Sequence, residues 1–306
     1  MTGGRNGASS GDDGEVWTVL RLMRWSGTYL EEKGVERGRL DAELLLAHAL
    51  DVERLQLYLQ FDRPLQPAEL DRFRPLLKRR AGREPLQYIV GRAGFRELHL
   101  RVDPRVLIPR PETEGLVEEV LAWAAAAGRT GLSALDLGTG TGAIALSLAL
   151  EGPFARVVGT DVSEGALAVA RENAADVTTD GQVEFRQGSL YAPLGPQERF
   201  DVVVSNPPYI AEAEASSLQP EVGEWEPPEA LYGGPDGLAI VRGIVGGAGG
   251  RLAPGGLLAL EIGAGQAGPV VAAVEQTGEY EEVRVRRDLS GRERIVTARK
   301  PPGRDG

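Results

Sequence analysis

The second half of the chain alternates short apolar runs with longer amphipathic segments, and this alternation constrains the fold more than any other feature. Strands are expected at residues 133–138, 155–161, 182–187 and 200–205. Helices expected at 143–152 and 163–176 separate the first three of these strands. A strand–helix–strand series favours a parallel sheet with helices on both faces. We therefore predict an α/β, doubly wound, Rossmann-like sheet.

The end of the chain departs from this alternation. A helix near 237–250, a strand at 255–263 and a helix at 266–277 are followed by two strands, at 280–288 and 292–300. Because no helix separates these last two strands, we expect them to pair antiparallel. The predicted sheet therefore has an antiparallel last strand, and the domain that contains it is expected to span residues 111–300.

The first part of the chain has helical periodicity and little strand pattern. Leu40, Leu44 and Leu45 recur at helical spacing, and a later segment begins at Pro67 and ends near Gly82, as a helix would. A small all-helical N-terminal domain is therefore predicted at residues 16–83.

The segments that flank these domains have a different character. Residues 84–110 alternate apolar and polar positions and are predicted to form a short β-hairpin linker. Residues 1–15 are small, polar and Gly-rich, which predicts a disordered tail. Residues 301–306 are expected to form a second tail.

Composition excludes several classes of site. The 306 residues include no cysteine and only two histidines, so disulfides, thiolate metal sites and thiol catalysis are excluded and no metal is expected. The net charge of −11 argues against a protein that binds nucleic acid directly. No apolar run reaches the ~18 residues of a membrane span. We expect a cytoplasmic monomer.

A glycine-rich loop follows the first predicted strand. Gly138, Gly140 and Gly142 would let the backbone turn tightly and approach a ligand, beside the positive end of the next helix. Asp161 ends the second strand, where an acidic side chain commonly binds ribose hydroxyls. The spacing also satisfies a dinucleotide-binding pattern. Asp136 favours S-adenosylmethionine, because a carboxylate there could accept a hydrogen bond from a ligand ammonium group.

The sequence Asn-Pro-Pro-Tyr follows the strand at 200–205. In a doubly wound sheet it would lie on the same rim as the glycine loop. The side-chain oxygen of Asn206 and the backbone carbonyl of Pro207 could accept both hydrogens of a substrate –NH2 group. Pro208 stiffens the path, and the ring of Tyr209 could pack against a planar group. This arrangement predicts that a planar nitrogen is held in line with an electrophile.

These motifs together resemble a known family. "DLGTGTGAIAL" with "VSNPPYI" is similar to S-adenosylmethionine-dependent methyltransferases that act on planar nitrogens. The segments "EPLQYIVGRAGFRELHLRVDPRVLIPRPETEGLVEEVL", "WEPPEALYGGPDGL" and "DLSGRERIVTARK" resemble the HemK/PrmC family, the release-factor glutamine methyltransferases. The resemblance covers roughly residues 84–300, and the helical N-terminal region matches in kind.

The resemblance implies a reaction and a partner. The enzyme would transfer a methyl group from S-adenosylmethionine to the side-chain amide nitrogen N(5) of the glutamine in the Gly-Gly-Gln motif of peptide chain release factors, and so modulate translation termination. The helical domain would dock the release factor. Asn206 and Pro207 would be the catalytic pair, and Pro208 and Tyr209 would complete the substrate slot.

The resemblance also implies a cofactor site. The glycine loop would surround the methionine moiety and Asp161 the ribose. Ser189 and Leu190 stand where the family often has an Asp and an aromatic residue near the adenine. The implied cofactor contacts are Gly138, Thr139, Gly140, Thr141, Gly142, Asp161, Ser189, Leu190 and Asn206.

Other functions share parts of this pattern. A methyltransferase acting on the amino group of adenine in DNA or RNA could use the same four residues, and so could an enzyme that methylates a ribosomal-protein glutamine. A nucleotide-binding oxidoreductase could use the glycine loop, but it would leave residues 206–209 without a role. A binding module without activity is the least favoured alternative.

Overall fold

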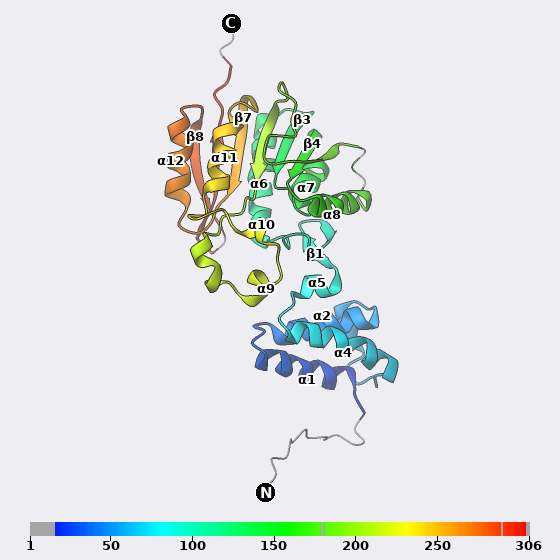
Figure 1. Ribbon diagram of the computed structural model, residues 1–306. Helices are drawn as coiled ribbons and strands as arrows, with labels where there is room; N and C mark the ends of the chain where they lie inside the picture. The colour runs from blue at the N-terminus through cyan, green and yellow to red at the C-terminus, as the bar shows by residue number, and fades with distance from the viewer. Residues whose placement is uncertain (1–15, 178, 180, 289, 304–306) are drawn as a thin grey trace. The chain divides into compact units, whose positions relative to one another are not determined.

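The computed structural model describes residues 16–177, 179, 181–288 and 290–303. The chain divides between Val90 and Gly91 into two compact units (Figure 1). The predicted tail at 1–15 lies outside the described residues, and so do residues 304–306 of the second predicted tail.

The first unit is helical and has its own core. Leu45, Leu46 and Phe73 are buried in that core, and a buried ion pair of 2.7 Å joins Arg80 to Asp41. The helix at Pro67–Ala81 continues through Pro75. The helices of this unit are α1 (Val19–Glu32), α2 (Gly38–Leu50), α3 (Arg54–Leu59), α4 (Pro67–Ala81) and α5 (Leu86–Val90).

Residues 84–110 are shared between the two units. Ile89 of α5 is buried in the helical core. Strands β1 (Arg92–Phe95) and β2 (Leu98–Arg101) pair antiparallel as a hairpin, and Phe95 is buried in the core of the second unit. Each part of the segment is thus held by apolar side chains that it buries in one unit or the other, and the hairpin predicted within the segment is present.

The second unit contains a seven-stranded sheet with the order β5-β4-β3-β6-β7-β9-β8. Strands β3 to β7 are parallel, and β9 pairs antiparallel with both β7 and β8. The strands are β3 (Leu132–Leu137), β4 (Phe154–Asp161), β5 (Val183–Gln187), β6 (Phe200–Ser205), β7 (Leu252–Glu261), β8 (Glu281–Arg287) and β9 (Glu293–Arg299). The predicted doubly wound α/β class with an antiparallel last strand is confirmed.

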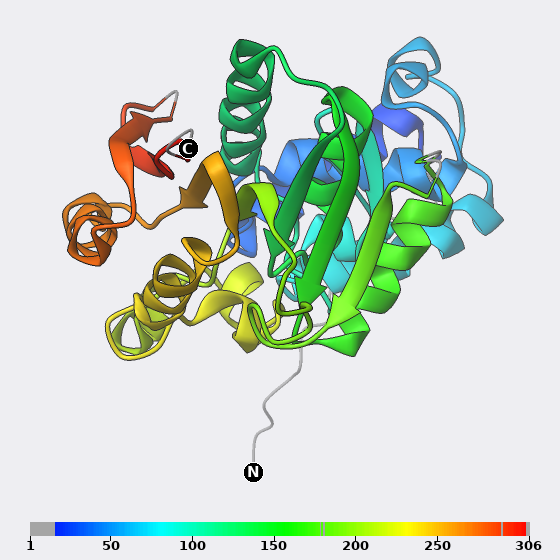
Figure 2. The same cartoon turned by 90° about the horizontal axis from the view of Figure 1, so that it is seen from above.

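Helices cover both faces of this sheet. They are α6 (Pro111–Ala127), α7 (Ala143–Glu151), α8 (Glu164–Ala175), α11 (Ala239–Ala248) and α12 (Ala267–Thr277), with the short η1 (Glu212–Ser217), α9 (Pro220–Gly223) and α10 (Pro228–Leu231) between β6 and α11. Figure 2 shows the blue-green α6 and the yellow α11 on opposite sides of the strands.

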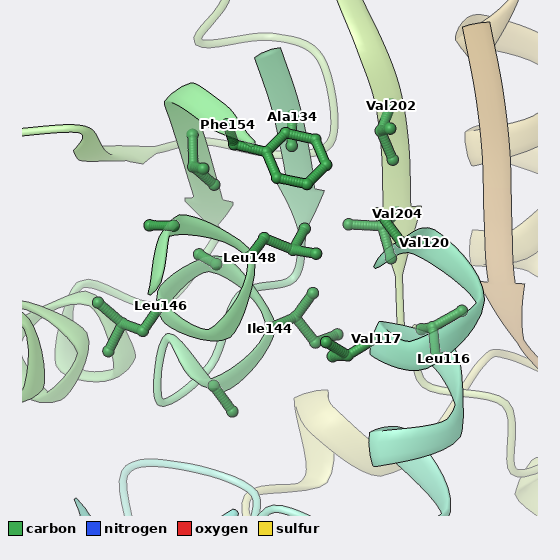
Figure 3. Packing of buried hydrophobic residues seen from close by; sticks show 14 of the residues in the cluster. Leu116, Val117, Val120, Ala134, Ile144, Leu146, Leu148, Phe154, Val202 and Val204 are labelled. Atoms are coloured by element: carbon green, nitrogen blue, oxygen red, sulfur yellow. The ribbon is translucent and has the colours of Figure 1, made fainter. Parts of the chain in front are cut away.

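Alternation along the central strands separates two apolar cores. Ala134 packs with side chains of α6 and α7 on one face, whereas Leu135 packs with side chains of α11 and α12 on the other. Figure 3 shows the first core, where Ile144 and Leu148 of α7 approach the sheet residue Val204. Full burial of such side chains stabilises the fold by about 1.5–3 kcal/mol each.

The strand order brings the loops that follow β3 and β6 next to each other at one edge of the sheet. Strand β3 lies between β4 and β6, so the chain leaves β3 in one direction along the sheet and returns to its other side at β6. This reversal is a topological switch point, where the loops after β3 and β6 diverge and leave a crevice. In the part of the chain that the structure describes, no helix is long and apolar enough to cross a membrane.

Candidate active site

A pocket with an empty volume of about 830 Å³ lies at the carboxyl ends of the parallel strands. Residues that follow β3, β4, β5 and β6 line it, together with residues from the segment before α6 and from α11. The predicted site residues among them are Gly138, Gly140, Asp161, Ser189, Leu190, Asn206, Pro207 and Pro208.

Four predicted site residues lie outside this lining. Thr139 donates a hydrogen bond of 2.6 Å to Asp136, and the carbonyl of Thr141 accepts one of 2.9 Å from Asn173. Gly142 caps the N-terminus of α7 with a φ of 81°. Tyr209 is half-buried beyond the lining residues. The threonines and Gly142 shape the glycine loop, whereas Tyr209 shapes the rim.

The glycine loop leaves space in front of its backbone. Gly138 and Gly140 have φ angles of 72° and 54°, which L-residues rarely adopt. A Cβ atom added at either position would meet no atom within 4 Å. The amides of Gly138 and Thr139 donate to the carbonyl of Thr160, at 2.8 and 2.9 Å. The loop is therefore tied to β4 while its outer side stays open to a ligand.

Two carboxyl groups flank the loop. Asp161 accepts hydrogen bonds of 2.9 Å from the amides of Gly140 and Ser163, and burial raises the pKa of its carboxyl above the usual value. Asp136 is fully buried behind the loop and does not line the pocket. Burial raises its pKa to about 7, and among the described residues its Oδ1 has no hydrogen-bond partner.

These features fit the cofactor expected from the sequence. The open side of the loop and the Asp161 carboxylate offer a backbone cradle and an acceptor, and the Asp136 carboxyl is buried behind the loop. S-adenosylmethionine has a sulfonium amino acid joined to a ribose, and these parts match the backbone cradle and the carboxylate acceptor. Asp136 was expected to contact the ligand ammonium directly. In the structure this carboxyl is buried and lies outside the pocket lining, so its direct contact with the ammonium group stays a prediction.

The far end of the pocket is less polar. Leu190 has a φ of 47°, and its carbonyl accepts a hydrogen bond of 3.3 Å from Thr160. Its side chain packs against the core that contains Ile244, which also lines the pocket. Ser189 beside it supplies a hydroxyl. A flat heterocycle could pack against Leu190 and Ile244 at this end.

The Asn-Pro-Pro-Tyr loop is supported from behind. The carbonyl of Tyr209 accepts a hydrogen bond of 2.9 Å from the Gln266 side chain. A Cβ atom on Gly237 would lie 2.3 Å from that carbonyl oxygen, and one on Gly233 would lie 2.5 Å from the carbonyl oxygen of Pro208. Only glycine permits this close approach, so the backbone of the loop has little freedom to move away from the pocket.

The Asn206 side chain is held by residues that sequence analysis missed. Its Nδ2 donates to Thr113 Oγ1 at 2.9 Å, and Thr113 Oγ1 donates to Glu261 Oε2 at 2.7 Å. Burial raises the pKa of Glu261 to about 7. Burial, with the charge of Glu261, also raises the pKa of Tyr209 to about 12. Glu261 ends strand β7 on the carboxyl rim, a position that the strand-tip rule could have identified, whereas Thr113 carried no local signal.

A second missed contact joins two walls of the pocket. The buried carboxylate of Glu226 pairs with Arg110 at 2.5 Å and accepts from the amide of Ile108 at 3.4 Å. The residues on either side of this contact, Leu107 and Pro227 among them, line the pocket. The Arg110–Glu226 pair therefore fixes the segment before α6 to the segment that leads into α10.

Both units of the chain are similar to known protein families. Residues 21–91 match the family described as PrmC N-terminal domain, and residues 119–220 match the methyltransferase small domain. A release factor glutamine methyltransferase of Geobacter sulfurreducens is 47% identical, over 93% of this chain and 98% of the relative. One of Rhodopirellula baltica is 40% identical, over 93% of this chain and 97% of the relative.

A solved structure shares the fold. A methyltransferase from Pyrococcus furiosus superposes with a TM-score of 0.51 at 21% identity, covering 67% of this chain and 90% of that protein. At that identity the likeness concerns the fold alone.

Proposed function

The chain belongs to the family of release factor glutamine methyltransferases, and from this premise we propose that it methylates the N(5) amide nitrogen of the glutamine in the Gly-Gly-Gln motif of peptide chain release factors, with S-adenosylmethionine as the methyl donor. The observation that carries the proposal is that Asn206 and Pro207 line the same pocket as the glycine loop and Asp161. An acceptor pair for an –NH2 group thus lies in one pocket with a site that fits the methyl donor. The reaction would modulate translation termination.

The substrate amide is held by two oxygens of this chain. Because Thr113 holds Asn206 Nδ2, the Asn206 side-chain oxygen is the atom available to accept one amide hydrogen. The Pro207 carbonyl accepts the other, and Pro208 and Tyr209 shape the slot around the planar amide. Fixing both hydrogens presents one face of the nitrogen, and this positioning lowers the barrier by up to about 7–11 kcal/mol in favourable cases.

The bond changes need no base from the protein. The cofactor supplies an electrophilic methyl group on a sulfonium, which is a good leaving group. The amide nitrogen would form the new N–C bond as the S–C bond breaks, and the nitrogen would then lose one proton to water. Asn206 and Pro207 act as catalytic residues by binding and orienting the nitrogen throughout.

The cofactor contacts follow the pocket. The loop from Gly138 to Gly142 holds the methionine moiety, with Thr139 and Thr141 fixing the shape of the loop. Asp161 would accept from the ribose hydroxyls, and Ser189 and Leu190 would contact the adenine. Asn206 lines the same pocket as the glycine loop and would contact both the donor and the acceptor.

The helical unit docks the release factor. Trp25 and Phe61, each about half exposed, line one hollow of this unit together with Arg24. Trp25 also stacks on Tyr29 at 5.4 Å between ring centroids. Exposed aromatic clusters beside arginine are typical of protein interaction sites. The enzyme would act as a cytoplasmic monomer that contacts the protein substrate and no nucleic acid.

A labelling experiment tests this function. Purified protein is incubated with methyl-labelled S-adenosylmethionine and, in parallel, with unmodified release factor, ribosomal protein or duplex DNA. We expect label only in the release factor, and none in a release factor whose Gly-Gly-Gln glutamine is replaced by alanine. Equal labelling of that replaced protein would overturn the acceptor, and label in the ribosomal protein or the DNA alone would support one of the alternative activities.

A further inference from the structure

Three separate segments of the chain meet behind Asn206. Thr113 lies in the first turn of α6, Asn206 follows β6 and Glu261 ends β7. Thr113 and Glu261 are both buried, with exposed fractions of 4% and 1%. The hydrogen bonds of 2.9 and 2.7 Å connect the three side chains in one line, from the pocket wall to a buried carboxyl group.

The chemistry of the three groups gives this line a direction. An ionised carboxylate only accepts hydrogen bonds, so Thr113 must use its single hydroxyl proton toward Glu261. The Thr113 oxygen can then only accept from Asn206, which requires the –NH2 end of the Asn206 carboxamide to face Thr113. The carbonyl end of Asn206 is thereby turned away from Thr113.

A neutral Glu261 would remove this constraint. Its protonated oxygen could donate to Thr113, and the hydroxyl of Thr113 could then donate to a rotated Asn206. The Asn206 –NH2 group would take the place of the acceptor oxygen. Two –NH2 groups cannot hydrogen-bond through their hydrogens, so that rotamer would not bind a substrate amide.

We propose that Thr113 and Glu261 are positioning residues, which hold the Asn206 side chain with its oxygen toward the substrate nitrogen when Glu261 is ionised. This proposal rests on the proposed function for the identity of the substrate. The orientation of Asn206 is a property of the chain itself and can be measured without a substrate.

Charged groups from every neighbouring segment act on Glu261. Arg294 of β9 and Arg110 before α6 favour the ionised form, whereas burial and the charge of Glu112 oppose it. Tyr209, which follows β6, also faces this carboxyl group. Burial is the largest influence and raises the pKa of Glu261 to about 7. The fraction of correctly oriented Asn206 should therefore rise as the pH rises through that value.

Kinetics of three variants test whether the hydrogen bonds from Glu261 through Thr113 orient Asn206. Thr113→Val removes the hydroxyl at nearly constant volume and should lower kcat roughly ten- to hundredfold, with the Kd of S-adenosylmethionine unchanged. Thr113→Ser keeps the hydroxyl and should recover most of the lost kcat. The unaltered enzyme should show a step near pH 7 in its kcat profile, and Glu261→Gln should remove that step. Equal losses in the Val and Ser variants, or the same profile in Glu261→Gln, would refute the proposal.

A spectroscopic measurement separates this proposal from the proposed function. The two Nδ2 protons of Asn206 give a pair of signals in nitrogen–proton correlation spectra, assigned by their loss in Asn206→Asp. We expect these signals to titrate with a midpoint near 7 in the unaltered protein and not in Glu261→Gln. If the Asn206 signals titrate in a protein that fails to methylate release factor, the proposed function is overturned and the positioning role of Thr113 and Glu261 is kept. If the protein methylates release factor and the Asn206 signals do not titrate, the positioning role is overturned and the function is kept.

Discussion

Asn206 is the residue of the pocket to which we assign the most specific chemical task. Its side chain is oriented by Thr113, and the Asn-Pro-Pro-Tyr backbone beside it is supported by Gln266 and the two close glycines. An acceptor that is preorganised in this way needs little reorganisation when the substrate binds. The cost of removing it should therefore appear in the chemical step more than in cofactor binding.

Asn206→Ala should lower kcat by roughly a hundred- to a thousandfold, because one of the two acceptors for the substrate –NH2 group is lost. The Kd of S-adenosylmethionine should change by only a few-fold, since the glycine loop and Asp161 remain. Single-turnover methylation and calorimetric titration of the cofactor measure these two quantities. A variant that keeps kcat but loses cofactor affinity would show that Asn206 serves the donor alone.

Asp136 makes the stability of the ligand-free protein depend on pH. Burial raises the pKa of this carboxyl to about 7, above its value in an unfolded chain, so the folded state binds the proton more tightly. The free energy of unfolding should therefore fall as the pH rises from the unfolded pKa towards 7, and then level off. Between about pH 5.5 and pH 8.5 this group should contribute a loss of about 2 kcal/mol.

Denaturant unfolding of the protein and of Asp136→Asn at both pH values checks this expectation. The variant should lose less stability on going to high pH, whatever its stability at a single pH, because the amide does not titrate. Glu261, whose pKa burial also raises to about 7, contributes in the same direction and remains in both proteins. Identical pH dependence in the two proteins would contradict the assignment to Asp136.

At the scale of elements, the segment between β6 and α11 folds back on the Asn-Pro-Pro-Tyr loop. The amide of Ile210 donates to the carbonyl of Leu231 at 3.0 Å, and the amide of Gly233 donates to that of Ile210 at 3.0 Å. The approach depends on glycine at positions 233 and 237, where side chains would collide with the carbonyls of the loop. Glycines that are distant from Asn206 in the sequence thus support the backbone of the Asn-Pro-Pro-Tyr loop.

Gly237→Ala should displace the loop, because its Cβ would lie 2.3 Å from the Tyr209 carbonyl oxygen and its φ is 72°. We expect a loss of about 1–3 kcal/mol in stability and a fall in kcat of more than about tenfold. Thermal unfolding and steady-state kinetics measure both effects.

Gly246→Ala is the matched control for this substitution. It lies in α11, and an added Cβ meets no atom within 4 Å. Alanine there should leave kcat unchanged and stabilise the helix by about 0.5–1 kcal/mol. If both variants lost activity equally, the close approach at Gly237 would not be the cause.

At the scale of the whole molecule, three apolar cores are divided between the two units, one in the helical unit and two in the second unit. The helical unit buries its apolar side chains within residues 19–90, whereas both cores of the second unit lie after residue 94. The pocket is built entirely from residues of the second unit. If the helical unit docks the release factor as proposed, substitutions there should disturb docking and leave methyl transfer in the pocket intact.

The double substitution Trp25→Ser and Phe61→Ser should raise the KM for release factor by roughly ten- to hundredfold, because aromatic anchors of an interface are removed. Methylation of a short Gly-Gly-Gln peptide should be unchanged, since the peptide needs only the pocket. Leu150→Ser, which alters an exposed apolar residue of α7 in the second unit, is the control and should leave both KM values as they are. A double variant that methylates release factor normally would place the docking surface elsewhere.

Local patterns in the sequence predict the strands of the large sheet, the longer helices and the motifs. Local periodicity predicted the strands and helices, because each depends on residues within a few turns. The rule that ligands bind at strand tips placed Gly138 and Asn206 on one rim, and the strand order β4-β3-β6 confirms that their strands are neighbours. The fold class followed from these local signals, whereas the family, the reaction and the cofactor were implied by the resemblance of the motifs to known methyltransferases.

Only the tertiary structure decided which side chains orient the site. Thr113 is 93 residues from Asn206 and 148 residues from Glu261, and Glu226 is 116 residues from Arg110. Such pairs depend on how α6 and β7 pack beside β6, and no local pattern encodes that packing. For the same reason the sequence pattern predicted residues 84–110 as one segment. The structure shows that Ile89 is buried in the helical core and Phe95 in a core of the second unit.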